Sequence, residues 1–291
     1  MFVLIALLKS MRPKQWAKNG FVFVALFFDG KLLDPISLAR TVGTFVLLCA
    51  MSGAVYLMND LSDIEGDRQH PTKRNRPLAA GELNPKAAAI AAILLAGGSL
   101  LAGFFLSLEL AGVLLLYLVI QIAYTYWLKN VVLFDVLIVA LGFVLRIAAG
   151  VVVIDVQRFS PWLYLFGGFL ALFMVLGKRR HELVLLGDDA GKHRKILAEY
   201  NLDLVDRLLG LVTTSVLVFY SLYTFLAEGL PLNHTMMLTI PFVLYAIFRY
   251  LYLIHIRHEG GAPEEILLRD RPLQVTLVAF AGFVFVILYI F

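Results

Sequence analysis

Long apolar segments constrain the fold of this chain more than any other feature of its sequence. Runs of roughly 20 apolar residues recur along its 291 residues, of which 60% are hydrophobic and 16% are charged. As a helix, each run can cross a bilayer core of about 30 Å. The alternating segments of about ten residues that mark a membrane β-barrel are not seen. The sequence therefore predicts an all-α, polytopic integral membrane protein, with residues 1–291 forming a single domain.

Nine transmembrane helices are expected from these runs. They cover residues 19–34, 38–58, 86–106, 109–128, 131–154, 161–177, 208–227, 235–256 and 273–291. Twenty of the 25 lysines and arginines then fall on the side of the N-terminus, and three fall on the other side. Because cytoplasmic loops are enriched in these residues, we expect a cytoplasmic N-terminus and an external C-terminus in the inner (plasma) membrane.

The charged connections lie on the same side as the N-terminus. They are residues 59–85, 178–207 and 257–272, whereas the connections on the other side are short and plain. We therefore expect the chemistry at the cytoplasmic face. The one cysteine, Cys49, excludes an intrachain disulfide and a cysteine metal cluster. With a net charge of only +4, the expected surroundings are membrane lipids and not nucleic acid.

The most charged segment, residues 58–81, joins two apolar runs. Asn59, Asp63 and Asp67 follow one another at intervals of four residues. If the helix continues, each step drifts by about 40°, so the three side chains share one face. Oxygen ligands on one face suit Mg²⁺, which is usually bound by one or two carboxylates together with substrate phosphates. The spacing therefore favours a site for a magnesium-bound phosphorylated substrate.

Basic residues follow this acidic block directly. Lys73, Arg74 and Arg76 can contact the same phosphates, the arginines through their two-pronged guanidinium groups. A solvated loop of mixed charge is the alternative. Such a loop needs neither regular spacing nor an acidic block followed by a basic one, so a phosphate site is favoured.

At this point the residues resemble a known family. The segment 59–67, NDLSDIEGD, is similar to the NDxxDxxxD motif of the UbiA-type intramembrane prenyltransferases, and 74–78, RNRPL, is similar to their basic segment. The resemblance implies nine helices around a central cavity that opens to the cytoplasmic face. It also implies that Asp63 and Asp67 are catalytic and that Mg²⁺ is held by Asn59, Asp60, Asp63 and Asp67.

The second aspartate motif expected of this family is replaced here by basic residues. Lys178, Arg179 and Arg180 stand at that position with Glu182, and the adjacent Asp188 and Asp189 do not have DxxxD spacing. In this the chain resembles one branch, the polyprenyl-phosphate phosphoribosyltransferases, which include the decaprenyl-phosphate 5-phosphoribosyltransferases. Further similar segments are 12–19, 177–182, 263–266, 269–271 and 273–274.

This resemblance implies a reaction. The 5-phosphoribosyl group of phosphoribosyl pyrophosphate (PRPP) is transferred to a long polyprenyl phosphate and pyrophosphate is released, a first step towards lipid-linked ribose or arabinose donors for cell-wall glycans. The acceptor oxygen is already an anion, so no general base is needed. Cations and Mg²⁺ can stabilise the departing pyrophosphate, and attack at the anomeric carbon passes through an oxocarbenium-like state. By analogy we expect inversion there.

Other residues at the expected inner face have two interpretations. Lys18, Tyr126, Lys129 and Arg271 are candidates for substrate binding, together with the basic residues 178–180 and Glu182. Lys18, Tyr126 and Lys129 can equally be snorkelling cations and belt aromatics.

Three charged residues lie within the expected spans. Asp135 and Arg146 are functional candidates as intramembrane ionisable groups. We favour a structural pairing for Arg146, a place for Asp135 along the donor cavity, and snorkelling for Arg249.

Two other functions compete with the phosphoribosyltransferase. A prenyltransferase that joins a prenyl diphosphate to an aromatic or other acceptor is disfavoured by the missing second aspartate motif. A secondary transporter is disfavoured because its coupling residues would lie near the midplane, often within inverted repeats. The sequence sets neither the length of the lipid chain nor the final glycan. The sequence is compatible with a homo-oligomer.

Overall fold

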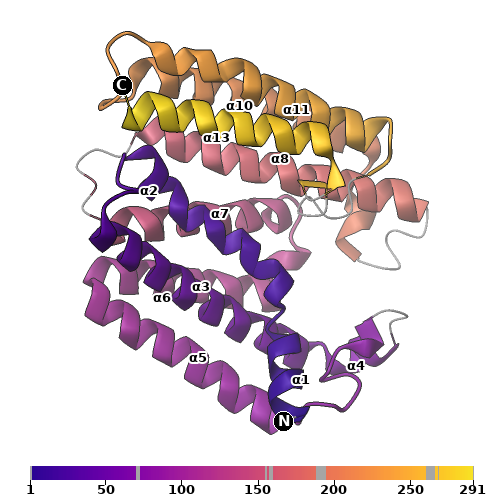
Figure 1. The fold of residues 1–291 in the computed structure, drawn as a ribbon. Helices are drawn as coiled ribbons and strands as arrows, with labels where there is room; N and C mark the ends of the chain where they lie inside the picture. Colours follow the sequence, from indigo (N-terminus) through magenta and orange to yellow (C-terminus); the bar gives the residue numbers. More distant parts are fainter. Residues whose placement is uncertain are drawn as a thin grey trace. The chain divides into compact units, whose positions relative to one another are not determined.

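The structure is a computed structural model that describes residues 2–69, 73–154, 156, 160–187, 195–259, 266–267 and 269–290. Within these ranges the chain is helical and contains no strand (Figure 1). Its contacts group the chain into two compact units that alternate along the sequence. The expectation of a single domain stays a prediction, and each unit is described below by itself.

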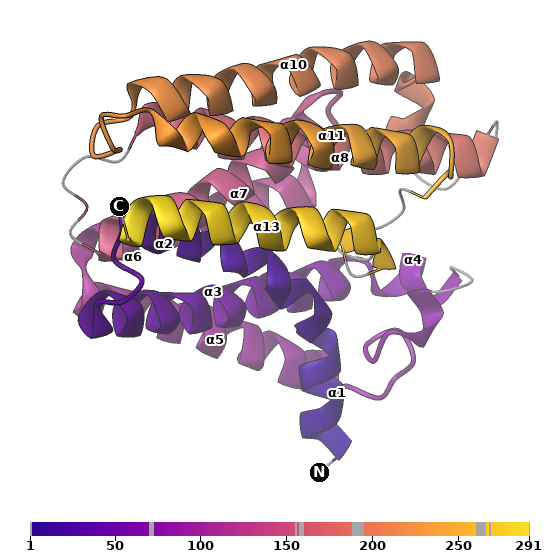
Figure 2. The same ribbon diagram turned by 45° about the horizontal axis from the view of Figure 1, so that its top comes forward.

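The first unit comprises Met1–Leu26, Lys31–Tyr126 and Leu145–Val156. Its helices are α1 Phe2–Ser10, η1 Pro13–Val22, α3 Pro35–Ser62, α4 Ile64–Gln69, η2 Lys73–Asn75, α5 Pro85–Leu106 and α6 Leu108–Tyr126. Helix α3 packs along α5 and also contacts η1 and α6. The short helix α4 lies at the end of α3 in each view (Figures 1 and 2).

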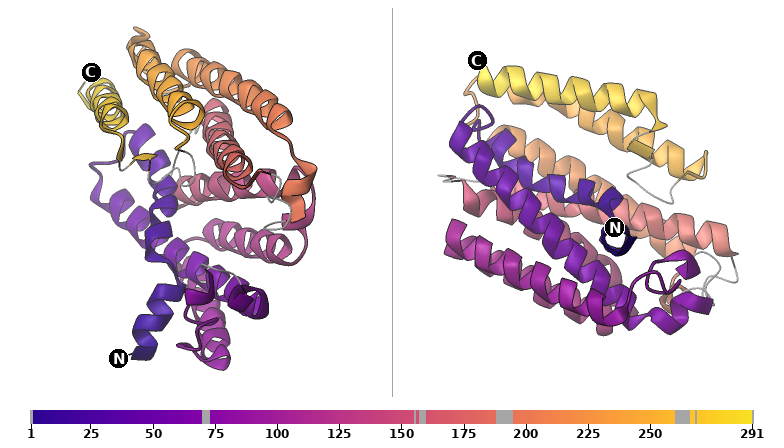
Figure 3. Two further views of the ribbon diagram at one scale, coloured as in Figure 1. Left: turned by 90° about the vertical axis from the view of Figure 1, so that its right-hand side faces the viewer. Right: turned by 60° about the horizontal axis from the view of Figure 1, so that its bottom comes forward.

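The second unit comprises Phe27–Gly30, Trp127–Val144 and Gln157–Phe291. Its helices are η3 Leu128–Asn130, α8 Pro161–Leu186, η5 Lys195–Glu199, α10 Leu202–Leu226, η6 Thr235–Thr239, α11 Ile240–His255 and α13 Arg271–Tyr289. Helix α10 packs against α8 and α11, and α11 packs against α13, so these four helices run side by side (Figures 1 and 3). Two further helices, α2 Phe23–Phe28 and α7 Phe134–Val153, have residues in both units.

Eight helices are long and apolar enough to cross a membrane among the residues described. They correspond to eight of the nine expected spans. The expected first span, 19–34, is instead formed by the end of η1 and the six-residue helix α2. Polar Lys18 and Asn19 precede Gly20 in η1, and Gly30 adopts a left-handed φ of +70° just beyond α2, so no long regular helix forms here.

Two of the long helices in the first unit begin with the same local chemistry. Asp34 precedes Pro35 at the start of α3, and Asn84 precedes Pro85 at the start of α5. Each acidic or amide side chain accepts a hydrogen bond from a first-turn backbone N–H, at 2.9 Å for Asp34 and 2.8 Å for Asn84. Proline fits the first turn because its missing N–H would have no partner there. The bond from Ser37 lowers the pKa of Asp34.

A buried arginine holds the interior of the first unit. Arg146 of α7 donates from Nε to Asn19 Oδ1 (2.7 Å) and from Nη2 to the Tyr117 hydroxyl (2.9 Å). A charge in a bilayer-depth helix is tolerated when polar partners surround it. These bonds confirm the structural pairing predicted for Arg146.

One turn further along α7, the helix passes very close to η1. A Cβ atom on Gly150 would lie 2.1 Å from the carbonyl oxygen of Val22, so only glycine fits this crossing. The close approach fixes η1, and with it the N-terminal segment, against α7.

Candidate functional site

The residues of the NDxxDxxxD motif lie where α3 gives way to α4. Helix α3 ends at Ser62 and α4 begins at Ile64, so the helix does not continue regularly as the spacing argument assumed. The four-residue steps nevertheless persist in the backbone. Asp63 N donates to Asn59 O (3.1 Å), and Asp67 N donates to Asp63 O (2.8 Å). We call Asn59, Asp60, Asp63 and Asp67 the carboxylate cluster.

Two arginines neutralise the buried part of this cluster. Asp60 is 2% exposed, and its Oδ1 accepts from Arg12 and from Arg76 (3.2 Å). Arg76 Nη1 also donates to Oδ2 of buried Asp67 (2.6 Å). Arg12 lies 4.7 Å above the ring of Tyr56. Since a buried charge is costly unless paired, this Arg12–Asp60–Arg76–Asp67 chain is what allows two carboxylates inside the unit.

The other two members of the cluster contact hydroxyl groups. The Asn59 side-chain oxygen accepts from Thr125 at the end of α6, and Asp63 Oδ1 accepts from Ser62 (3.1 Å). Among the residues described, no group of three or more histidine, cysteine, aspartate or glutamate side chains is placed to hold a metal. A magnesium site therefore needs the amide oxygen of Asn59 beside Asp63 and Asp67, a donor set of hard oxygen atoms that fits Mg²⁺ together with substrate phosphates.

The predicted basic residues differ in how closely they approach the carboxylate cluster. A cavity of about 380 Å³ is lined by Lys9, Ser10, Arg12, Asp60, Lys73, Asn75, Arg76 and Pro77. Lys73 and Arg76 thus line the same cavity as Asp60, and Arg74 lies exposed between them in sequence, on η2. Helix α4 packs against η2, which places the acidic and basic blocks together.

Two further candidates of the first unit lie on other elements. Lys18 is half-buried on η1, and Tyr126 is exposed at the last position of α6, next to Thr125. The structure places Tyr126 on the helix end that supplies the hydroxyl partner of Asn59.

A second charged cluster forms in the other unit, around Arg179 about two turns before the end of α8. Its Nη2 donates to Asp135 Oδ2 (2.6 Å) and its Nη1 donates to Glu182 Oε2 (2.7 Å). Asp135 is fully buried, and its Oδ1 accepts from the Tyr200 hydroxyl (2.6 Å). We call Asp135, Arg179, Glu182 and Tyr200 the Arg179 cluster. The interpretation of Asp135 as a donor-cavity residue remains a prediction.

The neighbours of Arg179 have different surroundings. Arg180 Nε donates to Asp206 Oδ1 at the start of α10 (2.7 Å), and its Nη1 donates to the Ile254 carbonyl at the end of α11 (3.3 Å). Arg180 therefore ties three helices together. Lys178 is exposed beside it, and Lys129 lies half-buried on η3. Of the three consecutive cations predicted to bind substrate, Lys178 is exposed, Arg180 is half-buried and Arg179 is buried.

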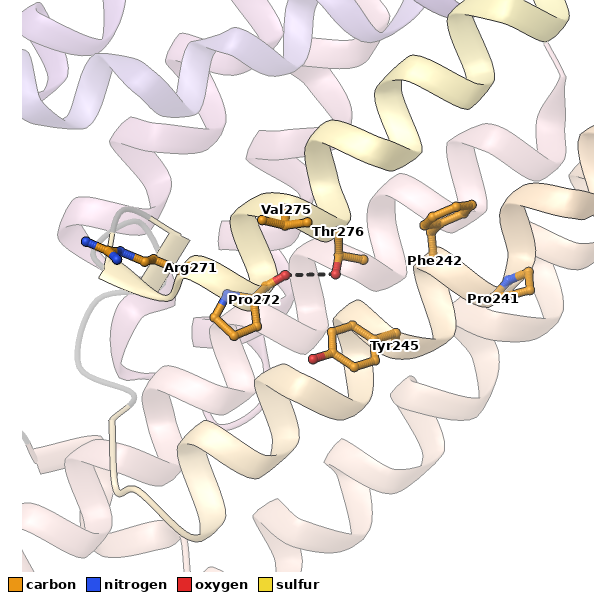
Figure 4. A pocket seen from close by; sticks show the side chains of 7 residues that line it. All are labelled: Pro241, Phe242, Tyr245, Arg271, Pro272, Val275 and Thr276. Atoms are coloured by element: carbon orange, nitrogen blue, oxygen red, sulfur yellow. Dashed lines mark hydrogen bonds between the residues drawn. The ribbon is translucent and has the colours of Figure 1, made fainter.

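Arg271 begins α13 and lines a groove between α11 and α13 (Figure 4). The groove has a volume of about 590 Å³ and is lined by Pro241, Phe242, Tyr245, Arg271, Pro272, Val275 and Thr276. In Figure 4 the Arg271 side chain extends away from Tyr245, and the Thr276 hydroxyl donates to the Pro272 carbonyl (2.8 Å).

The residue before Arg271 fixes the start of α13. Asp270 accepts three hydrogen bonds from Arg249 of α11, two from Nε and the shortest, at 2.8 Å, from Nη2, and these bonds lower the pKa of Asp270. Arg249 was expected to snorkel. The pairing with Asp270 was not predicted, and snorkelling of Arg249 stays a prediction.

Some predicted features lie outside the described residues, namely Asp188, Asp189 and the segment 263–265. Sequence reasoning also missed some partners. Thr125 and Tyr200 carry no local signal, because each is a single hydroxyl that meets its carboxylate or amide 66 or 65 residues away in sequence. Arg12 stood within a segment noted for its resemblance, but its pairing with Asp60 could not be read from spacing.

The helices and the two charged clusters define the class of this protein: a polytopic integral membrane protein with ionised groups gathered at helix ends. The family model described as "UbiA prenyltransferase family" matches residues 20–266. The chain belongs to the UbiA prenyltransferase family.

Relatives and solved structures agree with this membership. A decaprenyl-phosphate phosphoribosyltransferase of Mycolicibacterium smegmatis is 38% identical over 95% of this chain and 90% of its own length. That of Corynebacterium glutamicum is 35% identical over 98% of this chain and 87% of its own length. In fold, the chain is similar to a UbiA homologue from Archaeoglobus fulgidus bound to GPP and Mg²⁺, with a TM-score of 0.76, 18% identity, and coverage of 97% and 99% of the two chains.

Proposed function

We propose that this protein is a membrane-embedded pentosyltransferase that moves the 5-phosphoribosyl group from PRPP to a polyprenyl phosphate. The observation that carries this proposal is the basic end of α8, where Lys178, Arg179 and Arg180 replace a second aspartate motif. A monophosphate acceptor needs cations and not a second metal. Relatives named decaprenyl-phosphate phosphoribosyltransferase, at 35–38% identity over most of the chain, support it.

The donor diphosphate is assigned to the first unit. Asn59, Asp63 and Asp67 would hold Mg²⁺, with Asp63 and Asp67 as the catalytic carboxylates. When bound, the metal supplies Lewis-acid stabilisation of the departing pyrophosphate. The sequence adds Asp60 as a fourth ligand. Because Asp60 pairs with two guanidinium groups whereas Asp67 pairs with one, we propose that Asp60 holds Arg12 and Arg76 in place instead.

The acceptor phosphate is assigned to the basic residues of α8. Exposed Lys178 would contact it directly, with Lys129, Arg179, Arg180 and Glu182 shaping the surroundings. An acceptor oxygen attacks the anomeric carbon of the donor, the bond from that carbon to pyrophosphate breaks, and pyrophosphate leaves with the bonding electrons. The attacking oxygen is already ionised, so the protein has only to position the groups and stabilise charge. The remaining proposed substrate contacts are Lys18, Lys73, Arg74, Arg76, Tyr126 and Arg271.

The proposal includes an orientation in the membrane. The N-terminus and the active site would face the cytoplasmic side of the inner (plasma) membrane, where a soluble phosphorylated sugar is available, and the C-terminus would lie outside. The concentration of lysine and arginine on one side of the spans supports this orientation.

One assay tests the reaction. Purified protein is incubated with radiolabelled PRPP, a polyprenyl phosphate and Mg²⁺, and we expect a labelled lipid that disappears on addition of a chelator. Asp63→Asn should abolish it while the protein stays folded. Glu65→Gln is the matched control, because Glu65 is an exposed carboxylate of the same segment whose ion pair with Arg68 lies at the surface. Turnover of a prenyl diphosphate without any labelled lipid would refute the proposal in favour of a prenyltransferase.

A further inference from the structure

We propose that Asp135 and Tyr200 are positioning residues for the acceptor phosphate, an inference that rests on the proposed function. Neither residue would touch substrate. Together they would fix the end of α8, which carries Lys178, and the turn before α7, which carries Lys129. The argument begins with the Arg179 cluster, since it joins elements that are far apart in sequence.

Both carboxylate oxygens of Asp135 accept hydrogen bonds within this cluster. Its Oδ2 accepts from Arg179 and its Oδ1 accepts from Tyr200, both at 2.6 Å. Arg179 is in turn held by Glu182 and is only 4% exposed. Charge-assisted bonds of this length are among the stronger ones in proteins. Both terminal nitrogens of buried Arg179 are engaged within the cluster, so we assign its effect to the placement of Lys178 beside it.

The Tyr200 hydroxyl also holds the turn that precedes α7. It accepts from the backbone N–H of Leu133 (2.9 Å) while it donates to Asp135. Leu133 has a left-handed φ of +66°, which is strained for a residue with a side chain. Such a conformation persists only where its surroundings enforce it. Tyr200 supplies one of those constraints, and η3, which carries Lys129, packs against η5 just before Tyr200.

The ring of Tyr200 is itself anchored. It is 6% exposed and packs in an apolar cluster with Leu183, Ile196, Leu197 and Val205. Burial, assisted by the bond to Asp135, raises the pKa of Tyr200 to about 12, so the phenol stays protonated and keeps donating. One fixed hydroxyl therefore links the turn before α7, the first turn of α7 and, through Asp135, the end of α8.

A purely stabilising buried ion pair is the competing explanation, and Tyr200→Phe separates the two. This change removes the hydroxyl but leaves the Asp135–Arg179 pair and the aromatic packing. Tyr220→Phe is the matched control. Tyr220 is a fully buried tyrosine of α10 in the same unit, and its hydroxyl bonds to Thr239 (2.6 Å), far along the helix from the Arg179 cluster.

The measurement is equilibrium binding of polyprenyl phosphate to the purified protein without donor, followed by steady-state kinetics with both substrates. For Tyr200→Phe we expect the acceptor Kd and KM to rise roughly 5- to 30-fold, the effect of one or two kcal/mol. The KM for PRPP should stay within about twofold, which lies inside the scatter of an uncoupled change. Tyr220→Phe should leave both unchanged. Asp135→Glu should restore part of the acceptor affinity that Asp135→Asn loses.

Equal acceptor affinity in Tyr200→Phe and Tyr220→Phe would overturn the inference, and so would a parallel rise in the KM of both substrates. If the Asp135 variants fail to fold, the tyrosine pair still decides. Failure of the proposed function is visible separately. In that case the wild-type protein forms no labelled lipid, whatever the binding measurement shows.

Discussion

Replacing Asp60 with asparagine tests whether this residue serves as an ion-pair centre or as a metal ligand. The carboxylate is 2% exposed, whereas the side chains of its partners Arg12 and Arg76 are 29% and 27% exposed. Removing one partner of a fully buried pair costs about 3–5 kcal/mol. Because water screens the two arginines, we expect a lower value for Asp60→Asn, about 2–4 kcal/mol of unfolding free energy.

The assay is thermal unfolding in detergent, run beside Mg²⁺ titration of transfer activity. A loss of that size lowers Tm by roughly 4–16 °C, given about 2–4 °C per kcal/mol for a chain of this order of length. The Mg²⁺ concentration for half-maximal activity should stay the same for the molecules that remain folded. Asp63→Asn is the converse variant, with an unchanged Tm and no product. An Asp60→Asn protein with wild-type Tm and a raised Mg²⁺ requirement would refute the ion-pair argument.

Two further predictions concern packing and pH. Gly150→Ala brings a Cβ to 2.1 Å from a backbone carbonyl, so we expect a loss of at least about 3 kcal/mol or failure to fold. Gly98→Ala, with open space around its Cβ, should be stable in the same unfolding assay, and equal stability of the two variants would contradict the crossing described here. Burial raises the pKa of Tyr200 from 10.0 to about 12 in the folded state. Its stabilisation is therefore complete below pH 10 and is lost as pH rises towards 12. The stability difference between wild type and Tyr200→Phe should shrink over this range, and a constant difference would count against the assigned hydrogen bonds.

The membrane architecture was accessible from the sequence because it depends on local composition. A run of apolar residues has few stable structures in a bilayer other than a helix, which satisfies its own backbone groups. Eight of the nine expected spans therefore appear as helices. The segment 19–34 does not form the expected long helix because Lys18, Asn19 and Gly30 interrupt the apolar pattern near both ends. An average of hydropathy over many residues does not detect such interruptions.

The two charged clusters could be predicted from the sequence only in part. The spacing of Asn59, Asp63 and Asp67 is a local signal, and the structure keeps their backbone steps even though the helix breaks at Asp63. Which cation meets which carboxylate is decided by the packing of distant elements. No pattern indicated that Asp135 pairs with Arg179, 44 residues away, or that Arg249 reaches Asp270. Buried polar groups need hydrogen-bond partners, but the sequence does not indicate which residues provide them.

The Arg12–Asp60–Arg76–Asp67 chain has a consequence for biosynthesis. Arg12 is made first, and its carboxylate partner is made 48 residues later. Asp60 and Asp67 then share Arg76, which is 16 and 9 residues further on. Until Arg76 has left the ribosome, Asp60 and Asp67 have only one of their two arginine partners, Arg12, available to them. The membrane insertion machinery therefore has to keep the start of the chain and the end of α3 in contact with water until then. A nascent chain arrested before Arg76 has left the ribosome should remain open at this site, and one arrested after Arg76 has left it can close.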